Sequence, residues 1–139
     1  MRIMCLDLGE KTIGIALSDP FGWTAQGLEI INRKGQPKQE LNRLREIIKQ
    51  YEVEKVVVGL PKNMNGTTGP QAEKALDFIE YLKRKLGLVV EAWDERLSTV
   101  AAERILLSAD ISRGKRKKVI DKMAAAVILQ GYLDAHSCI

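Results

Sequence analysis

The segment "CLDLGEKTIGIALSD", residues 5–19, gives the clearest indication of the kind of fold. Two apolar runs, residues 2–8 and 13–18, are separated only by the turn "GEKT", a spacing typical of a β-hairpin. Within the first run Asp7 lies between two leucines, and a buried carboxylate is costly unless a partner compensates its charge. The stretch therefore predicts the start of a β-sheet and raises the question of what Asp7 binds.

Outward from this hairpin, the pattern predicts alternating strands and helices in the order β-β-β-α-β-α-β-α-α. Three strands in a meander followed by alternating helices and strands indicate an α/β protein with one mixed five-stranded sheet and helices on both faces. Apolar periodicity and turn residues place the later elements at strand 23–31, helix 38–51, strand 55–60, helix 70–86, strand 88–93, helix 98–107, a loop over 108–118 and a last helix over 119–133.

Length and composition indicate one globular domain over residues 1–139. The chain has 139 residues, 45% of them apolar and 29% charged, which is typical of a folded protein. No apolar run reaches the roughly 18 residues that span a bilayer, and we expect no membrane association. A strand begins almost at once, so no signal peptide is expected, and only two cysteines, Cys5 and Cys138, are present. These features predict a cytoplasmic protein.

The positive charge of the chain is concentrated in one run. The formal net charge is +4, and "RGKRKK", residues 113–118, places five cations in six positions. One interpretation is a solvated turn and helix start, and the other is contact with a nucleic-acid backbone.

Acidic residues at three distant positions are predicted to meet at one edge of the sheet. Asp7 is near the end of the first strand, and Asp94 and Glu95 directly follow the fifth. If these strands are parallel, their carboxyl ends share an edge, where ligands of open α/β sheets collect. Asp121 heads an apolar stripe of the last helix, with Ala124 and Ala125 after it. Because Asp7, Glu95 and Asp121 would repel one another, we expect a divalent cation such as Mg²⁺ between them.

Each acid also has a simpler interpretation. Asp7 could accept hydrogen bonds from the following turn or pair with an arginine. Asp121 could interact with the helix N-terminus or with Lys117 one turn earlier. The "DER" at residues 94–96 could be a charged surface cluster at a helix start.

An acidic cluster with two cations would suit phosphodiester hydrolysis, since two ions roughly 4 Å apart activate water and stabilise the leaving oxygen. Only 5% of the residues are aromatic, which argues against sequence-specific reading of unpaired bases. The expected partner is nucleic acid, held through its backbone phosphates. The candidate contacts for those phosphates are Lys11, Lys62, Arg96, Arg113, Lys115, Arg116, Lys117 and Lys118.

Four segments together resemble the bacterial YqgF/RuvX family, whose members are described as Holliday-junction resolvases and as pre-16S rRNA nucleases. In order and spacing they are "DLGEKTIGIALSD", "VVVGLPKNMNGTTGP", "DERLSTVAAERIL" and "DKMAAAVILQGYL", and the match extends from Arg2 to about Asp134.

The resemblance implies a ribonuclease-H-like fold and a cytoplasmic nuclease that depends on magnesium or manganese. The family's acidic positions fall on Asp7, on Glu95 with Asp94 as the alternative, and on Asp121. The implied substrate contacts include Asn63, Arg96, Ser98 and Thr99. Many members carry Asp where this chain has Asn65, so a turn role is the one that carries over to that position. Precursor rRNA and branched DNA remain alternative substrates, a non-catalytic binding module remains an alternative function, and the protein could be a monomer or a homodimer.

Overall fold

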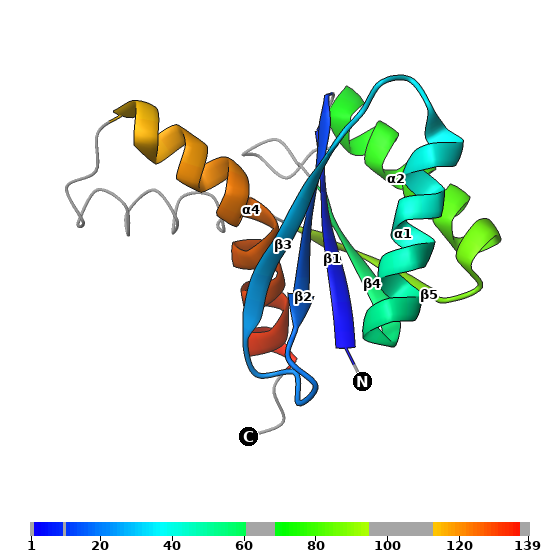
Figure 1. The fold of residues 1–139 in the computed structure, drawn as a ribbon, viewed down its shortest axis with the longest axis horizontal. Helices are drawn as coiled ribbons and strands as arrows, with labels where there is room; N and C mark the ends of the chain where they lie inside the picture. Colours follow the sequence, from blue (N-terminus) through cyan, green and yellow to red (C-terminus); the bar gives the residue numbers. More distant parts are fainter. Residues whose placement is uncertain (1, 10, 61–68, 95–112, 137–139) are drawn as a thin grey trace.

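The computed structural model describes residues 2–9, 11–60, 69–94 and 113–136, and over residues 113–123 it describes the backbone only. Five strands and three helices lie in these ranges (Figure 1). They are β1 (Arg2–Leu8), β2 (Thr12–Ser18), β3 (Ala25–Asn32), α1 (Pro37–Tyr51), β4 (Val53–Leu60), α2 (Pro70–Leu86), β5 (Val89–Asp94) and α4 (Arg113–Ala135).

The strands form one mixed sheet in the order β3-β2-β1-β4-β5. β1 is antiparallel to β2 and parallel to β4, and β4 is parallel to β5. The predicted mixed five-stranded sheet is therefore confirmed. β1 and β5 point the same way, so their carboxyl ends do lie at one edge.

Helices cover both faces of the sheet, with α1 and α2 on one side and α4 on the other (Figure 1). Successive side chains of a strand point to opposite faces of the sheet, so each strand contributes residues to the hydrophobic core on either face. In β1, for example, Met4 and Leu6 belong to the core beneath α1 and α2, while Cys5 belongs to the core beneath α4. β4 lies in the middle of the sheet and is buried on both faces from Val56 to Leu60, as its β-branched run predicted.

The ends of α1 and α2 follow from their sequences. Each begins with a proline, Pro37 or Pro70, whose missing N–H costs nothing in the first turn. α2 ends at Gly87, which adopts a left-handed conformation with φ of 68°. None of the described helices is long and apolar enough to cross a lipid bilayer.

Several boundaries differ from the prediction; β4, for example, begins at Val53 rather than at residue 55. Residues 113–118 were expected in a loop, but the described backbone is helical from Arg113 onward. Lys and Arg are good helix formers, so this cationic run extends the helix rather than interrupting it. β3 begins at Ala25 rather than at Trp23, because residues 19–24 form a hydrogen-bonded loop. The helix predicted over 98–107 lies outside the described residues.

Candidate active site

Asp7 is on β1, the central strand, and lies on the face of the sheet that α4 covers. It pairs with Gly14 of β2, and Gly14 pairs with Ile30 of β3, so the three positions form one row across the strands. A Cβ placed on Gly14 would lie 3.6 Å from the Cβ of Asp7 and 3.7 Å from the Cβ of Ala125 in α4. Asp7 therefore lies on the α4 side of the sheet, beside a glycine whose missing side chain lets α4 pack close to the strands.

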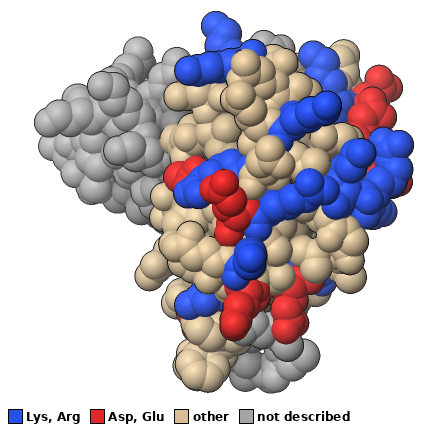
Figure 2. All heavy atoms as spheres, turned by 45° about the vertical axis from the view of Figure 1, so that its right-hand side comes forward, with Lys and Arg blue, Asp and Glu red and all other residues tan. Residues whose placement is uncertain are grey.

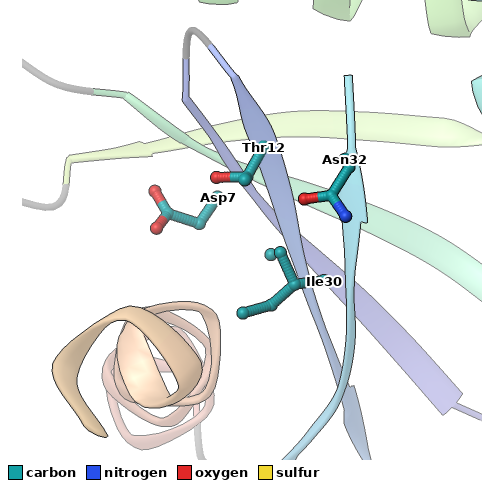
Figure 3. Close-up of a pocket in the computed structure, with 5 residues that line it drawn as sticks. Asp7, Thr12, Ile30 and Asn32 are labelled. Atoms are coloured by element: carbon teal, nitrogen blue, oxygen red, sulfur yellow. The ribbon is translucent and has the colours of Figure 1, made fainter. Parts of the chain in front are cut away.

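A pocket of about 430 Å³ opens at this point, lined by Asp7, Thr12, Gly14, Ile30 and Asn32. Figure 3 shows these side chains on β1, β2 and β3, with α4 beside the carboxylate of Asp7. Thr12 and Asn32 share the next row of the sheet, so two neutral polar groups stand beside the carboxylate. The pocket combines an acid, a hydroxyl and an amide with the half-exposed apolar side chain of Ile30, so it offers a ligand several hydrogen-bonding groups beside one apolar surface.

The turn after Asp7 is held by the backbone and by one arginine. The Gly9 N–H donates to the Thr12 carbonyl at 2.8 Å. A Cβ on Gly9 would lie only 3.1 Å from that carbonyl, which explains the glycine. The Arg33 guanidinium donates to the Gly9 carbonyl at 3.2 Å and to the buried Glu40 carboxylate at 3.0 Å. The edge of the sheet that carries Asp7 is thereby tied to α1.

Asp94 and Glu95 follow one another at the end of β5, and the structure shows on which face of the sheet Asp94 lies. Trp93 packs with the core beneath α4, on the same face as Asp7. Side chains alternate between faces along a strand, so Asp94 belongs to the α2 face, where its partner position Leu60 packs with Ala72. Of the two acids, Asp94 is thus on the wrong face to meet Asp7. Glu95 lies outside the described residues.

α4 carries the third predicted acid and packs on the sheet as expected. Ala125, Ile128 and Tyr132 are buried against the sheet, which confirms the predicted apolar stripe. Position 121 is one helical turn before Ala125 and so on the same side of the helix. The side chain of Asp121 is outside the described part of the chain.

Of the predicted substrate contacts, only Lys11 has a described side chain. It is exposed in the turn between β1 and β2, and its carbonyl accepts the Arg33 N–H at 2.7 Å. The predictions for Lys62, Asn63, Arg96, Ser98 and Thr99 lie outside the described residues. Arg113, Lys115, Arg116, Lys117 and Lys118 lie in the first turns of α4, where only the backbone is described. Thr12 and Asn32 were not predicted from the sequence, because cross-strand register cannot be read from periodicity.

The described residues contain no group of three or more His, Cys, Asp or Glu side chains placed to hold a metal ion. This finding does not include Glu95 or Asp121. Asp7 nevertheless presents hard carboxylate oxygens to a polar pocket, which fits Mg²⁺ or Mn²⁺ as a ligand.

A second polar cluster on the α4 face lies away from the pocket. Lys55 of β4 and Glu91 of β5 form an ion pair at 2.9 Å, and the Tyr132 hydroxyl donates to Glu91 at 2.9 Å. The hydrogen bond from Lys55 holds the pKa of Glu91 below its usual range, against the effect of partial burial. This cluster connects β4, β5 and α4, and we interpret it as structural.

The side of the molecule that carries α1 and α2 has mixed charge. Figure 2 shows Lys and Arg side chains spread over it, with Asp and Glu among them. Several of these charges are paired, such as Arg43 with Glu29 and Glu46, and Lys83 with Glu80. The hydrogen bonds to these two carboxylates raise the pKa of Arg43. The pairing is typical of a solvated helical face.

Comparisons with known proteins agree with this architecture. A family model described as "RuvX: Holliday junction resolvase" matches residues 1–135. A relative from Desulforamulus reducens is 67% identical over 97% of this chain and 98% of its own length. One from Bacillus thuringiensis is 61% identical over 97% of this chain and 99% of its own. Both are named "Putative pre-16S rRNA nuclease".

A solved structure of Thermus thermophilus RuvC in complex with a Holliday junction substrate also resembles this chain. Its TM-score is 0.54 at 19% identity, and the match covers 97% of this chain and 95% of that one. At this identity the likeness concerns the fold, and it confirms the expected ribonuclease-H-like class.

Proposed function

Because the chain belongs to the RuvX family of Holliday junction resolvases, we propose that it is a metal-dependent nuclease that hydrolyses phosphodiester bonds in structured nucleic acid. The single observation that carries this proposal is the position of Asp7. It lies at the carboxyl end of β1, in a pocket beneath α4, and α4 carries Asp121 one turn before Ala125. Ligands of open α/β sheets bind at that edge.

The proposed metal ligands are Asp7, Glu95 and Asp121, with Mg²⁺ or Mn²⁺, and two ions, as the cofactor. Glu95 is preferred over Asp94 because Asp94 belongs to the face of the sheet opposite to that of Asp7. When bound, such ions lower the pKa of a water and stabilise the leaving oxygen.

The chain's own residues would hold the substrate in place. Asp7 is fixed by the β1–β2 turn, which Arg33 ties to Glu40. Thr12 and Asn32 offer a hydroxyl and an amide to the sugar–phosphate chain. Ile30, 38% exposed, offers an apolar surface to the sugar. In the proposal, Lys11 and the cations at the start of α4 bind phosphates on either side of the pocket.

The proposed substrate is precursor 16S rRNA, cut during maturation of its 5′ end in the cytoplasm. The support is the shared name of relatives that match 97% of the chain at 61–67% identity. Branched DNA is the second candidate, favoured by the family's description and by the RuvC complex. Two-fold action on a four-way junction would require a homodimer, whereas cutting of one RNA strand would not.

The deciding experiment compares cleavage of a precursor rRNA fragment and of a synthetic four-way junction, each with Mg²⁺ and with Mn²⁺. Asp7→Asn is the matched variant, because it keeps the shape of the side chain while removing its charge. We expect cleavage by the wild type and none by Asp7→Asn, with substrate affinity retained. If both proteins bind and neither cleaves either substrate, the chain is a non-catalytic binding module.

A further inference from the structure

Two aromatic side chains are displayed to solvent at the end of the β2–β3 hairpin. Phe21 is 74% exposed and Trp23 is 72% exposed, the highest values among the exposed large hydrophobic residues of the described chain. Their ring centroids are 5.3 Å apart and their planes are tilted by 30°. Exposure of apolar rings of this size to water costs free energy, and exposed apolar patches often mark binding sites.

The loop that carries the two rings is held in one conformation. The Asp19 carboxylate accepts hydrogen bonds from the Trp23 and Thr24 N–H groups at 2.7 and 2.9 Å. Gly22, with φ of 74°, makes the tight turn between the two aromatic residues. The Asp19 N–H in turn donates to the Thr24 carbonyl at 3.0 Å. The aromatic pair is therefore presented by an ordered loop.

α4 fixes the same loop from the side. The Gln130 amide donates to the Trp23 carbonyl at 3.0 Å and accepts from the Ala25 N–H at 3.0 Å. Position 130 is nine residues beyond Asp121 on the same helix. One helix thus connects the predicted metal site with the aromatic loop.

The exposed pair is too small to support a stable protein interface on its own. Aromatic side chains bury about 150–250 Å² each, so two of them supply less than the roughly 800 Å² per partner of a standard interface. Their exposed neighbours, such as Pro20, Thr24 and Gln26, are polar or lack a large apolar side chain. A stacked nucleobase, by contrast, needs only the face of one ring.

We propose that Phe21 and Trp23 stack on unpaired bases of the nucleic acid whose backbone is cut at the Asp7 pocket. This inference rests on the proposed function. The pocket and the aromatic pair lie at opposite ends of the same hairpin, since Thr12 begins β2 and the loop follows Ser18 (Figure 1). At about 3.4 Å per residue the two sites are roughly 20 Å apart. A single strand leaving the pocket along the hairpin would cover this distance with a few nucleotides.

Stacking here would not depend on phosphate contact. The hydrogen bond from the Thr24 N–H lowers the pKa of Asp19, which stays negatively charged beneath the loop at neutral pH. A negative group does not attract phosphate, so the rings are expected to contribute affinity without counterion release. Base stacking on a ring is tolerant of sequence, which is compatible with the low aromatic content of the chain.

The test measures binding of a labelled 12-nucleotide single-stranded RNA and of a blunt RNA duplex by fluorescence anisotropy at several salt concentrations. We expect Phe21→Ala and Trp23→Ala each to weaken single-strand binding about tenfold, within the range for loss of one stacked base. The slope of affinity against salt and the affinity for the duplex should not change. Val89→Ala is the control, because Val89 is also apolar and 58% exposed.

A second measurement reports on the ring directly. The chain has two tryptophans, Trp23 and Trp93, so Trp93→Phe leaves Trp23 as the only one. Its emission should be quenched saturably by the single strand and not by the duplex. The proposal is overturned if Phe21→Ala binds single strands as the wild type does. It is also overturned if that variant instead converts a dimer to a monomer in sedimentation velocity. Cleavage by the wild type and by Asp7→Asn is measured separately. Failure of the proposed nuclease function is therefore distinguishable from failure of the proposed base stacking.

Discussion

Asp7 and Ala125 flank a single glycine: a Cβ on Gly14 would lie 3.6 Å from the Cβ of Asp7 and 3.7 Å from that of Ala125. These are ordinary van der Waals separations, so Gly14→Ala should fold normally and lower kcat/KM only severalfold. Gly14→Val adds two more carbons than Gly14→Ala and should lower kcat/KM by at least tenfold. It should also lower the free energy of unfolding by about 1–3 kcal/mol.

Steady-state kinetics and urea unfolding of both variants test this prediction. The control is Ala92→Val, which adds the two Cγ carbons of valine at an exposed position of β5. Activity of Gly14→Val equal to the wild type would show that substrate does not enter this pocket.

The Arg33–Glu40 pair should be a major contributor to stability near the site. Glu40 is only 7% exposed at its side chain and lies 3.0 Å from Arg33, whose guanidinium also donates to the Gly9 carbonyl and lies over the Phe78 ring. Glu40→Ala leaves a partly buried cation without its partner and should cost about 2–4 kcal/mol. Lys83→Ala removes a pair whose side chains are 48% and 69% exposed, and should cost less than about 0.5 kcal/mol. Equal losses in urea unfolding would contradict the structural role of Arg33.

Glu91 should make stability depend on pH in the acid range. Its pKa is lowered below the ordinary value of 4.5, chiefly by the hydrogen bond from Lys55. A carboxyl whose pKa is lower in the folded state stabilises above its unfolded pKa, and this contribution is lost as the pH falls through the folded pKa. Since Glu91 is 41% exposed at its side chain, we expect Glu91→Gln to cost only about 0.5–1 kcal/mol at pH 7.

The measurement is the free energy of unfolding of wild type and Glu91→Gln from pH 7 to pH 3. The difference between the two proteins should shrink below about pH 4.5. A difference that stays constant over the whole range would show that the ion pair does not stabilise the fold.

The cations at the start of α4 are predicted to bind phosphate. Reversing Arg116 and Lys117 to Glu should weaken binding and reduce the slope of affinity against salt by about one for each phosphate contact removed. The matched control reverses Lys83 and Arg84, which are exposed in the last turn of α2. An equal change in slope for both pairs would point to net charge rather than to a contact at α4.

The sequence predicted the sheet because its signals were local. Each signal lies within a few residues of the element that it predicts. Examples are the hairpin turn, the β-branched run of β4, and the prolines and glycine at the ends of α1 and α2. The start of α4 is less well predicted, because the run of cations from Arg113 is compatible both with a solvated loop and with a helix.

The pocket was only half predictable for a related reason. Asp7 was conspicuous as a lone charge within an apolar run. Thr12 and Asn32 gave no such signal, because their proximity depends on the register between β2 and β3. That register shifts between Ile15 and Ala16, opposite Gly27 of β3; a glycine within a strand is compatible with a bulge but does not fix which residues pair.

The central claim is that Asp7, Glu95 and Asp121 bind divalent cations together. The most direct measurement is the anomalous difference map of crystals of the wild type and of Asp7→Asn soaked in manganese chloride. We expect manganese coordinated by the Asp7 carboxylate and shared with the other two acids, and its loss in Asp7→Asn. Carboxylates more than about 10 Å apart, or manganese bound elsewhere with none at Asp7, would show that these three acids do not share a metal site.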